Sequence, residues 1–308
     1  YSVTETYWFS FSVPEENLHG QIYLWMHPNL KITSAGCWMW RGPTRHYLEA
    51  DHFNFRNYLP YPTITDTEVQ VPEAGLTVRI VEPLEVVEVD YEDASSDTKV
   101  SFRATALIPP VARSTSKHFD QPMHLVGEIV LNGQRMALDC KSMRDKSWGE
   151  PRPEIGNLEH PPVCWGVGVS EDGKTAFNFS GVDDPAKAGG EWTDVFTLPA
   201  EKHFKEGWIY RNGELRKLVS MSKATERDPG NLDRIMSIVA DVVDEKGDHH
   251  IIKGTMLGCV QWSGWSNIGV HWNRMRWELE GGAISYGDAL EMTWAPHIKH
   301  VQGVKPKS

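Results

Sequence analysis

The chain has 308 residues, of which 40% are hydrophobic and 24% are charged, so it has the composition of a globular protein with a sizeable core. Its formal net charge of −11 disfavours nucleic acid as a partner, because phosphate backbones bind to basic patches. No run of about 18 apolar residues could form an integral membrane segment, and the first residues do not have the pattern of a signal peptide.

Short segments rich in aromatic and β-branched residues follow one another along the chain. ETYWFSFSV (5–13) and GQIYLWMH (20–27) are the first two, and PEENLH separates them. HLVGEIVLNGQRMALDC (124–140) contains Asn132-Gly133, the strongest short signal for a hairpin. Similar turns are expected at Asp172-Gly173, at Asn212-Gly213 and around Gly247. This pattern predicts antiparallel strands joined by tight turns.

Many short strands at regular spacing predict an all-β sandwich or barrel. A closed barrel of about eight strands needs far fewer residues than this chain has, so two units in tandem fit the length. The Pro- and Gly-rich stretch at 149–162 is the expected boundary. We therefore expect an N-terminal unit at 1–155 and a C-terminal unit at 156–308.

The four cysteines, Cys37, Cys140, Cys164 and Cys259, are scattered and include no CxxC pair. Dispersed thiols in a chain of this size usually indicate buried, reduced cysteines, so a cytoplasmic location is expected. Two long-range disulfides remain an alternative at this stage.

The 13 tryptophans outnumber both the tyrosines and the phenylalanines. Trp38 and Trp40 share one face of their predicted strand, because side chains alternate along a strand. Such indoles either fill the inside of a barrel or line a pocket for an apolar small molecule. We favour the pocket, and we expect its wall to include several of Trp8, Trp25, Trp38, Trp40, Trp148, Trp265 and Trp272.

Metal and cofactor motifs are weak. His46 and His52 flank two acidic residues, and His249-His250 follows a predicted turn, but neither spacing puts three ligands on one strand face. No phosphate-binding or dinucleotide-binding motif is complete. We predict neither a metal nor a cofactor.

MRDKSWGEP (143–151) follows a predicted strand and contains Asp145. An aspartate at a strand end commonly bonds to nearby backbone N–H groups, and the residues alone favour this turn-capping role. The alternative is a proton donor in an aromatic pocket.

Three stretches that span nearly the whole chain resemble the carotenoid 1,2-hydratase (hydroxyneurosporene synthase-like, AttH-type) group. They are ETYWFSF, RDKSWGE and ELEGGAISYGDALEMTWA. The group has two lipocalin-like β-barrels in one chain and an Asp-His-x-Trp-Gly signature. Asp145, Trp148 and Gly149 match this signature, whereas Lys146 stands where His is usual. That departure puts a histidine-assisted proton relay in doubt.

The resemblance implies a hydratase, dehydratase or isomerase that protonates an alkene of an isoprenoid substrate without a cofactor. Asp145 is then the proton donor and Trp148 its apolar, cation-stabilising neighbour. His271, Glu291 or Tyr286 would orient water or accept the returning proton. Two alternatives remain: a non-catalytic lipocalin-like lipid carrier, and a pericyclase or cyclase that folds a polyene.

Overall fold

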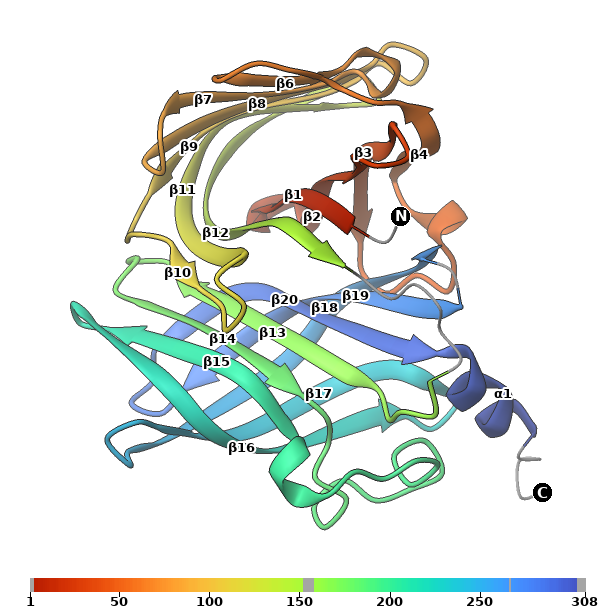
Figure 1. The fold of residues 1–308 in the computed structure, drawn as a ribbon, viewed down its shortest axis with the longest axis vertical. Coiled ribbons are helices and arrows are strands. Elements are labelled where there is room, and N and C mark those ends of the chain that lie inside the picture. The colour runs from red at the N-terminus through yellow and green to blue at the C-terminus, as the bar shows by residue number, and fades with distance from the viewer. Residues whose placement is uncertain (1–2, 152–157, 266, 304–308) are drawn as a thin grey trace. The chain divides into compact units, whose positions relative to one another are not determined.

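The structure is a computed structural model that describes residues 3–151, 158–265 and 267–303 (Figure 1). Antiparallel strands dominate it, so the all-β prediction is confirmed. The chain divides into two compact units. Unit 1 comprises Tyr1–Gly42 and Leu48–Arg152, and unit 2 comprises Pro43–Tyr47 and Pro153–Ser308. The boundary expected at 155/156 lies outside the described residues and stays a prediction.

Unit 1 is a curled antiparallel sheet of 12 strands in the described part of the chain (Figure 1). Its hydrogen-bonded order is β4-β3-β2-β1-β12-β11-β9-β8-β7-β6-β5, with β10 paired to β11. This order does not close on itself, so unit 1 is an open, curled sheet. The strands are β1 (Val3–Val13), β2 (Leu18–His27), β3 (Ile32–Arg41), β4 (His52–Pro60), β5 (Thr63–Ile64), β6 (Glu68–Val71), β7 (Leu76–Glu82), β8 (Val86–Asp93), β9 (Thr98–Ala106), β10 (Val111–Ala112), β11 (His118–Leu131) and β12 (Gln134–Pro151).

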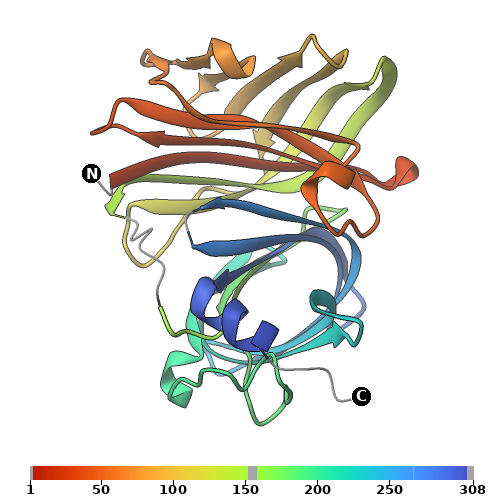
Figure 2. The ribbon, with the colours of Figure 1, turned by 90° about the vertical axis from the view of Figure 1, so that its right-hand side faces the viewer.

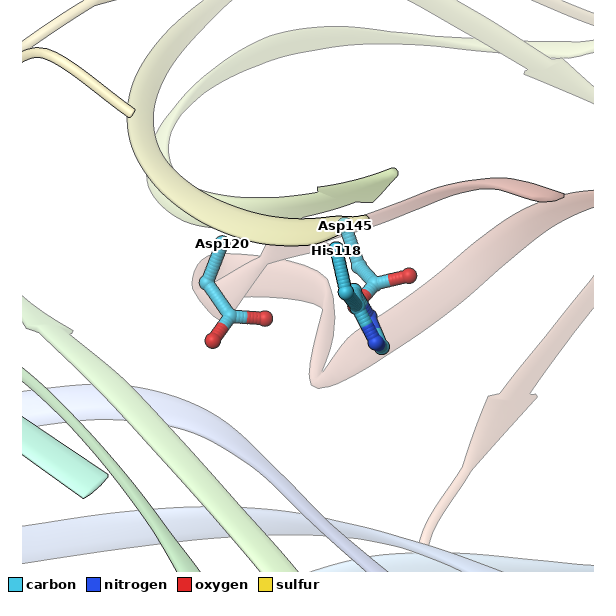
Figure 3. Close-up of side chains that lie close together, drawn as sticks. All are labelled: His118, Asp120 and Asp145. Atoms are coloured by element: carbon cyan, nitrogen blue, oxygen red, sulfur yellow. The ribbon is translucent and has the colours of Figure 1, made fainter. Parts of the chain in front are cut away.

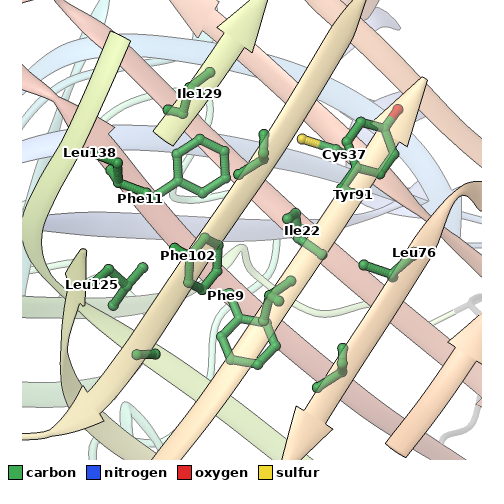
Figure 4. Close-up of a cluster of buried hydrophobic side chains, with 14 of the residues drawn as sticks. Phe9, Phe11, Ile22, Cys37, Leu76, Tyr91, Phe102, Leu125, Ile129 and Leu138 are labelled. Carbon is green, nitrogen blue, oxygen red and sulfur yellow. The ribbon is translucent and has the colours of Figure 1, made fainter. Parts of the chain in front are cut away.

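The core of unit 1 lies on one face of this sheet (Figure 4). Phe9 and Phe11 on β1 both pack against Phe102 on β9, with ring centroids 5.9 and 6.2 Å apart. Because side chains alternate along a strand, the even-numbered residues of β1 face the other way. Trp8 is therefore on the face opposite to the core, and this second face carries the candidate site.

Unit 2 is a closed barrel in which β13 to β20 follow one another in sequence order. Figure 2 looks towards one end of this barrel, where the C-terminal helix lies. Its elements are β13 (Val163–Ser170), β14 (Thr175–Gly181), β15 (Phe204–Arg211), β16 (Glu214–Asp228), β17 (Asn231–Asp244), β18 (His249–Trp265), β19 (Ile268–Leu279), β20 (Ile284–Trp294) and α1 (Ala295–Gly303). Short 3-10 helices occur at Pro14–Glu16, Tyr47–Glu49, Pro72–Ala74 and Ala200–Lys202.

Aromatic side chains fill part of the barrel of unit 2. Trp277 meets Phe177 and Phe179 edge to face, with ring centroids 5.6 and 5.8 Å apart. Gly166 and Gly168 make room for them, since a Cβ at either position would lie only 2.3–2.6 Å from a phenylalanine ring. This part of the barrel is packed solid, which is one of the two roles that the sequence left open for the indoles.

The expected hairpin turns are present. Asn132 and Gly133 both have positive φ (50° and 81°), as do Asn212 and Gly213 (52° and 89°). Two consecutive left-handed residues are what a type I′ turn requires, and Asn and Gly adopt this conformation most readily. The four cysteines are buried thiols and form no disulfide in the described residues.

Candidate functional site

Asp145 lies in the middle of the unit 1 sheet, because β12 runs between β1 and β11. It is directly opposite Asp120 on β11 and directly opposite Trp8 on β1. Residues that face each other across antiparallel strands have Cβ atoms about 5 Å apart. The sheet therefore holds two carboxyl groups and an indole side by side on one face.

His118 completes the cluster (Figure 3). It lies two residues before Asp120 on β11 and so shares its face. Its Nε2 is hydrogen-bonded to Oδ2 of Asp145. The side-chain ligand atoms of His118, Asp120 and Asp145 all lie within 4.8 Å of one another. An imidazole and two carboxyl groups are thus held close enough to exchange protons.

The two carboxyl groups of the cluster differ in their burial. Asp120 is fully buried, whereas the side chain of Asp145 is 11% exposed. Loss of solvent, together with the neighbouring charge of Asp145, raises the pKa of Asp120 to about 7 against the opposing effects of Arg113 and His118. Two acids this close titrate as a pair, because the first charge resists the second. The pair therefore keeps one proton near neutral pH.

An aromatic wall continues the face on which the cluster lies. Trp8 is directly opposite Tyr23 on β2, and Trp25 is directly opposite Thr6. Trp38 and Trp40 on β3 share this face by register and alternation. The four tryptophans are at most 4% exposed. Four of the seven tryptophans expected to line a pocket therefore lie on the face that carries Asp145.

Trp148 does not have the position expected of it. Its ring lies 6.0 Å from the ring of Phe119, on the core face of the sheet, and the side chain is 38% exposed. Alternation along β12 places it on the opposite face from Asp145, so Trp8 is the indole beside the acid. The resemblance matched Trp148 by sequence position, which does not show the side to which a strand residue points.

Lys146 also faces the core side. Its ammonium lies 4.2 Å from the ring centroid of Tyr7, and burial lowers its pKa to about 8. Lys146 therefore does not substitute for the histidine of the family signature. His118 supplies an imidazole to Asp145 instead, and it comes from the neighbouring strand.

His118 and Asp120 were not among the site residues predicted from the sequence, although the sequence contains a signal for them. A two-residue turn at Asn132-Gly133 pairs Leu131 with Gln134, and counting outwards from there pairs Asp120 with Asp145. The predicted hairpin thus already implied which residue faces the acid.

The same three side chains could hold a divalent cation, since two carboxylates and an imidazole are common metal ligands. The spacing along one strand did not reveal this set, because its members come from two strands. The expectation that no metal is bound stays a prediction.

The other predicted site residues belong to unit 2. His271 and Glu291 are directly opposite each other on β19 and β20 and face the inside of the barrel. Tyr286 is directly opposite Arg276 on the outward face. Trp272 also faces outward, by alternation with His271, and Trp265 lies 6.3 Å from Trp262 between ring centroids. The structure thus brings His271 and Glu291 together but leaves Tyr286 on the other face.

A family model described as a domain of unknown function, DUF7064, matches residues 2–296. The chain belongs to this family. No curated protein matches the DUF7064 chain. No helix in the described ranges has the length and hydropathy needed to cross a membrane.

Solved structures share the fold of this DUF7064 protein. A protein described as AttH from Nitrosomonas europaea is 11% identical, with a TM-score of 0.57 over 95% of this chain and 92% of that one. Kievitone hydratase from Nectria haematococca is 10% identical, with a TM-score of 0.58 over 94% of this chain and 89% of that one. The tandem lipocalin-like fold implied by the resemblance is confirmed.

Proposed function

We propose that this DUF7064 protein is a hydro-lyase or isomerase that protonates a carbon–carbon double bond of an isoprenoid-like substrate. The observation that carries the proposal is the pair Asp120 and Asp145, which face each other on adjacent strands beside His118 and Trp8. A carboxylic acid that is still protonated near neutral pH is the group that such chemistry needs. The acid assigned to Asp145 from the sequence is better described as the pair.

Hydration would proceed in two steps. The π electrons of the alkene take the proton shared by Asp120 and Asp145, a C–H bond forms, and the more substituted carbon becomes a tertiary cation. Water then adds through its oxygen, and its surplus proton passes to the carboxylate pair or to His118. The sum is alkene plus water giving a tertiary alcohol, with the acid regenerated. Dehydration uses the same groups in reverse order.

The neighbouring residues would support each step. His118 orients Asp145 through the hydrogen bond between them and accepts a proton when water attacks. The face of Trp8 stabilises a nearby cation through its π electrons. Burial of Asp120 keeps the acid neutral before the substrate is protonated.

The comparison with solved structures supports the class of reaction only through the fold. One structural neighbour is named as a hydratase of kievitone. At 10% identity this makes kievitone a reasonable first substrate to test, alongside linear isoprenoid alkenes. The similarity does not assign catalytic residues of that enzyme to positions in this chain.

The test is turnover of kievitone and of linear isoprenoid alkenes by the wild type and by Asp145→Asn, followed by chromatography and mass spectrometry. Loss of a general acid typically lowers kcat by about 10²–10⁴-fold. The matched control is Asp139→Asn, because Asp139 also lies on β12 and pairs with a histidine, His124, at 2.7 Å, yet its side chain is 72% exposed.

Full activity in Asp145→Asn would show that the acid lies elsewhere. Tight lipid binding by a wild type that turns over no alkene and no tertiary alcohol would favour a carrier. A rate that does not vary with pH would point to a pericyclase, in which the pocket only folds the substrate.

A further inference from the structure

Unit 2 contains a cavity of about 620 Å³ at one end of its barrel. This volume lies within the range of small-molecule sites in proteins. The wall is formed by helix α1, the segment between β14 and β15, the turn and first residues of β17, and the inner faces of β18 and β19. The lining residues are Glu191, Trp192, Pro229, Gly230, Asn231, Leu232, Asp233, Gln261, His271, Ile298, Val301 and Gln302. None of the tryptophans expected to line a pocket is among these described residues.

A row of polar side chains crosses the barrel at this end. Gln261, His271 and Glu291 face one another in register on β18, β19 and β20, and Cys164 on β13 continues the row. Gln261 and His271 reach the cavity wall. His271 is 7% exposed, and burial lowers its pKa more than the charges of Glu291 and Asp233 raise it. A neutral imidazole therefore borders the cavity.

Glu291 connects that row to a network of buried charges. The guanidinium of Arg227 donates two hydrogen bonds to the Glu291 carboxylate, at 2.6 and 2.8 Å, and lies 5.0 Å from the ring centroid of Trp192. Lys223 pairs with Asp183 in the same network. These four charges cancel one another. Arg227 is thus occupied by Glu291 and is not available to bind an anion in the cavity.

The residues that line the cavity determine which kind of ligand can bind there. Its charged members, Glu191 and Asp233, are both acidic, and no Lys or Arg is among the described lining residues. Gln261 and neutral His271 add hydrogen-bond acceptors. Trp192, Leu232, Ile298 and Val301 supply an apolar side. Anionic ligands are disfavoured here, whereas an apolar molecule with a hydroxyl donor meets both kinds of surface.

We propose that unit 2 has a ligand site of its own, at which a neutral aromatic or alicyclic small molecule binds with its hydroxyl group on His271. The site is contained in unit 2 and does not depend on the chemistry proposed for Asp120 and Asp145. It also gives His271 a role other than the water-orienting one expected from the sequence.

The test is a double-mutant cycle with two probes, 2-naphthol and naphthalene, which differ only in the hydroxyl group. Binding is measured by quenching of tryptophan fluorescence and by calorimetry on the full chain. His271→Leu should weaken 2-naphthol by about 3- to 10-fold, the value of one hydrogen bond, and leave naphthalene unchanged. His250→Leu is the control, because His250 lies on the neighbouring strand β18 and bonds to Asp244 at 3.0 Å, and it is not part of the cavity wall.

Leu232→Trp provides a second variant that does not depend on His271. It keeps the polar row and fills the cavity from the start of β17, so both probes should lose binding. Binding of 2-naphthol that is unchanged in both His271→Leu and Leu232→Trp would overturn the proposal. So would the absence of any binding of 2-naphthol to the wild type.

Discussion

Asp120→Asn is expected to make the protein more stable above neutral pH. In the folded chain the pKa of Asp120 is about 7, against an ordinary value of 3.8. The folded state therefore holds this proton more tightly than the unfolded chain does, and stability falls as pH rises from about 4 to about 7. Asparagine has nearly the same shape but no charge, so it removes that loss.

The size of the effect follows from the same pKa change. Each pKa unit corresponds to about 1.4 kcal/mol, so full ionisation of Asp120 destabilises the fold by up to about 4 kcal/mol. Because Asp120 shares the proton with Asp145, we expect this destabilisation to be smaller, roughly 2–3 kcal/mol. For a chain of this size the variant should melt roughly 3–5 °C above the wild type at pH 8, and close to it at pH 4.5.

Thermal and urea unfolding from pH 4.5 to pH 8.5 measure this difference directly. Asp139→Asn serves as the control, because its exposed pair with His124 should be worth at most about 1 kcal/mol. An Asp120→Asn variant that is less stable than the wild type at pH 8 would refute the reasoning. A stability gain that does not change with pH would refute it as well.

The rate of alkene turnover should fall as pH rises through the raised pKa of Asp120, and an unchanging pH–rate profile would exclude the acid pair. Trp8→Leu should lower kcat more than Trp40→Leu does, because of the four tryptophans on this face only Trp8 is directly opposite Asp145; equal losses of kcat in the two variants would remove its proposed role. Glu291→Gln should cost about 3–5 kcal/mol in urea unfolding, because it leaves Arg227 as a buried charge without its carboxylate, and a loss below 1 kcal/mol would contradict this.

Local signals in the sequence predicted much of the fold. Asn132-Gly133 and Asn212-Gly213 each end a strand and begin the next, because both residues tolerate the left-handed backbone of the turn. The curling of unit 1 and the closure of unit 2 depend on pairings between distant strands. The pairing of β1 with β12 joins residues far apart along the chain, for example Trp8 and Asp145. No local pattern specifies such a pairing.

The candidate site was predictable in part. Asp145 was singled out, and the hairpin at Asn132-Gly133 implied Asp120 as its partner by counting. The position of Trp148 was missed because the sequence predicted a strand end near Asp145, whereas β12 continues to Pro151 and alternation along it turns Trp148 to the opposite face. The ion pair of Arg227 and Glu291 depends on closure of the barrel, so neither residue's neighbours in sequence indicate it.

Solvent deuterium incorporation tests the central claim most directly. When the wild type converts kievitone or a linear isoprenoid alkene in D₂O, proton transfer from the acid pair leaves one deuterium on the carbon next to the new tertiary alcohol. We predict one carbon-bound deuterium per product molecule, and a rate about 10²–10⁴-fold lower in Asp145→Asn. A product formed by the wild type without carbon-bound deuterium would contradict protonation of the alkene by Asp120 and Asp145.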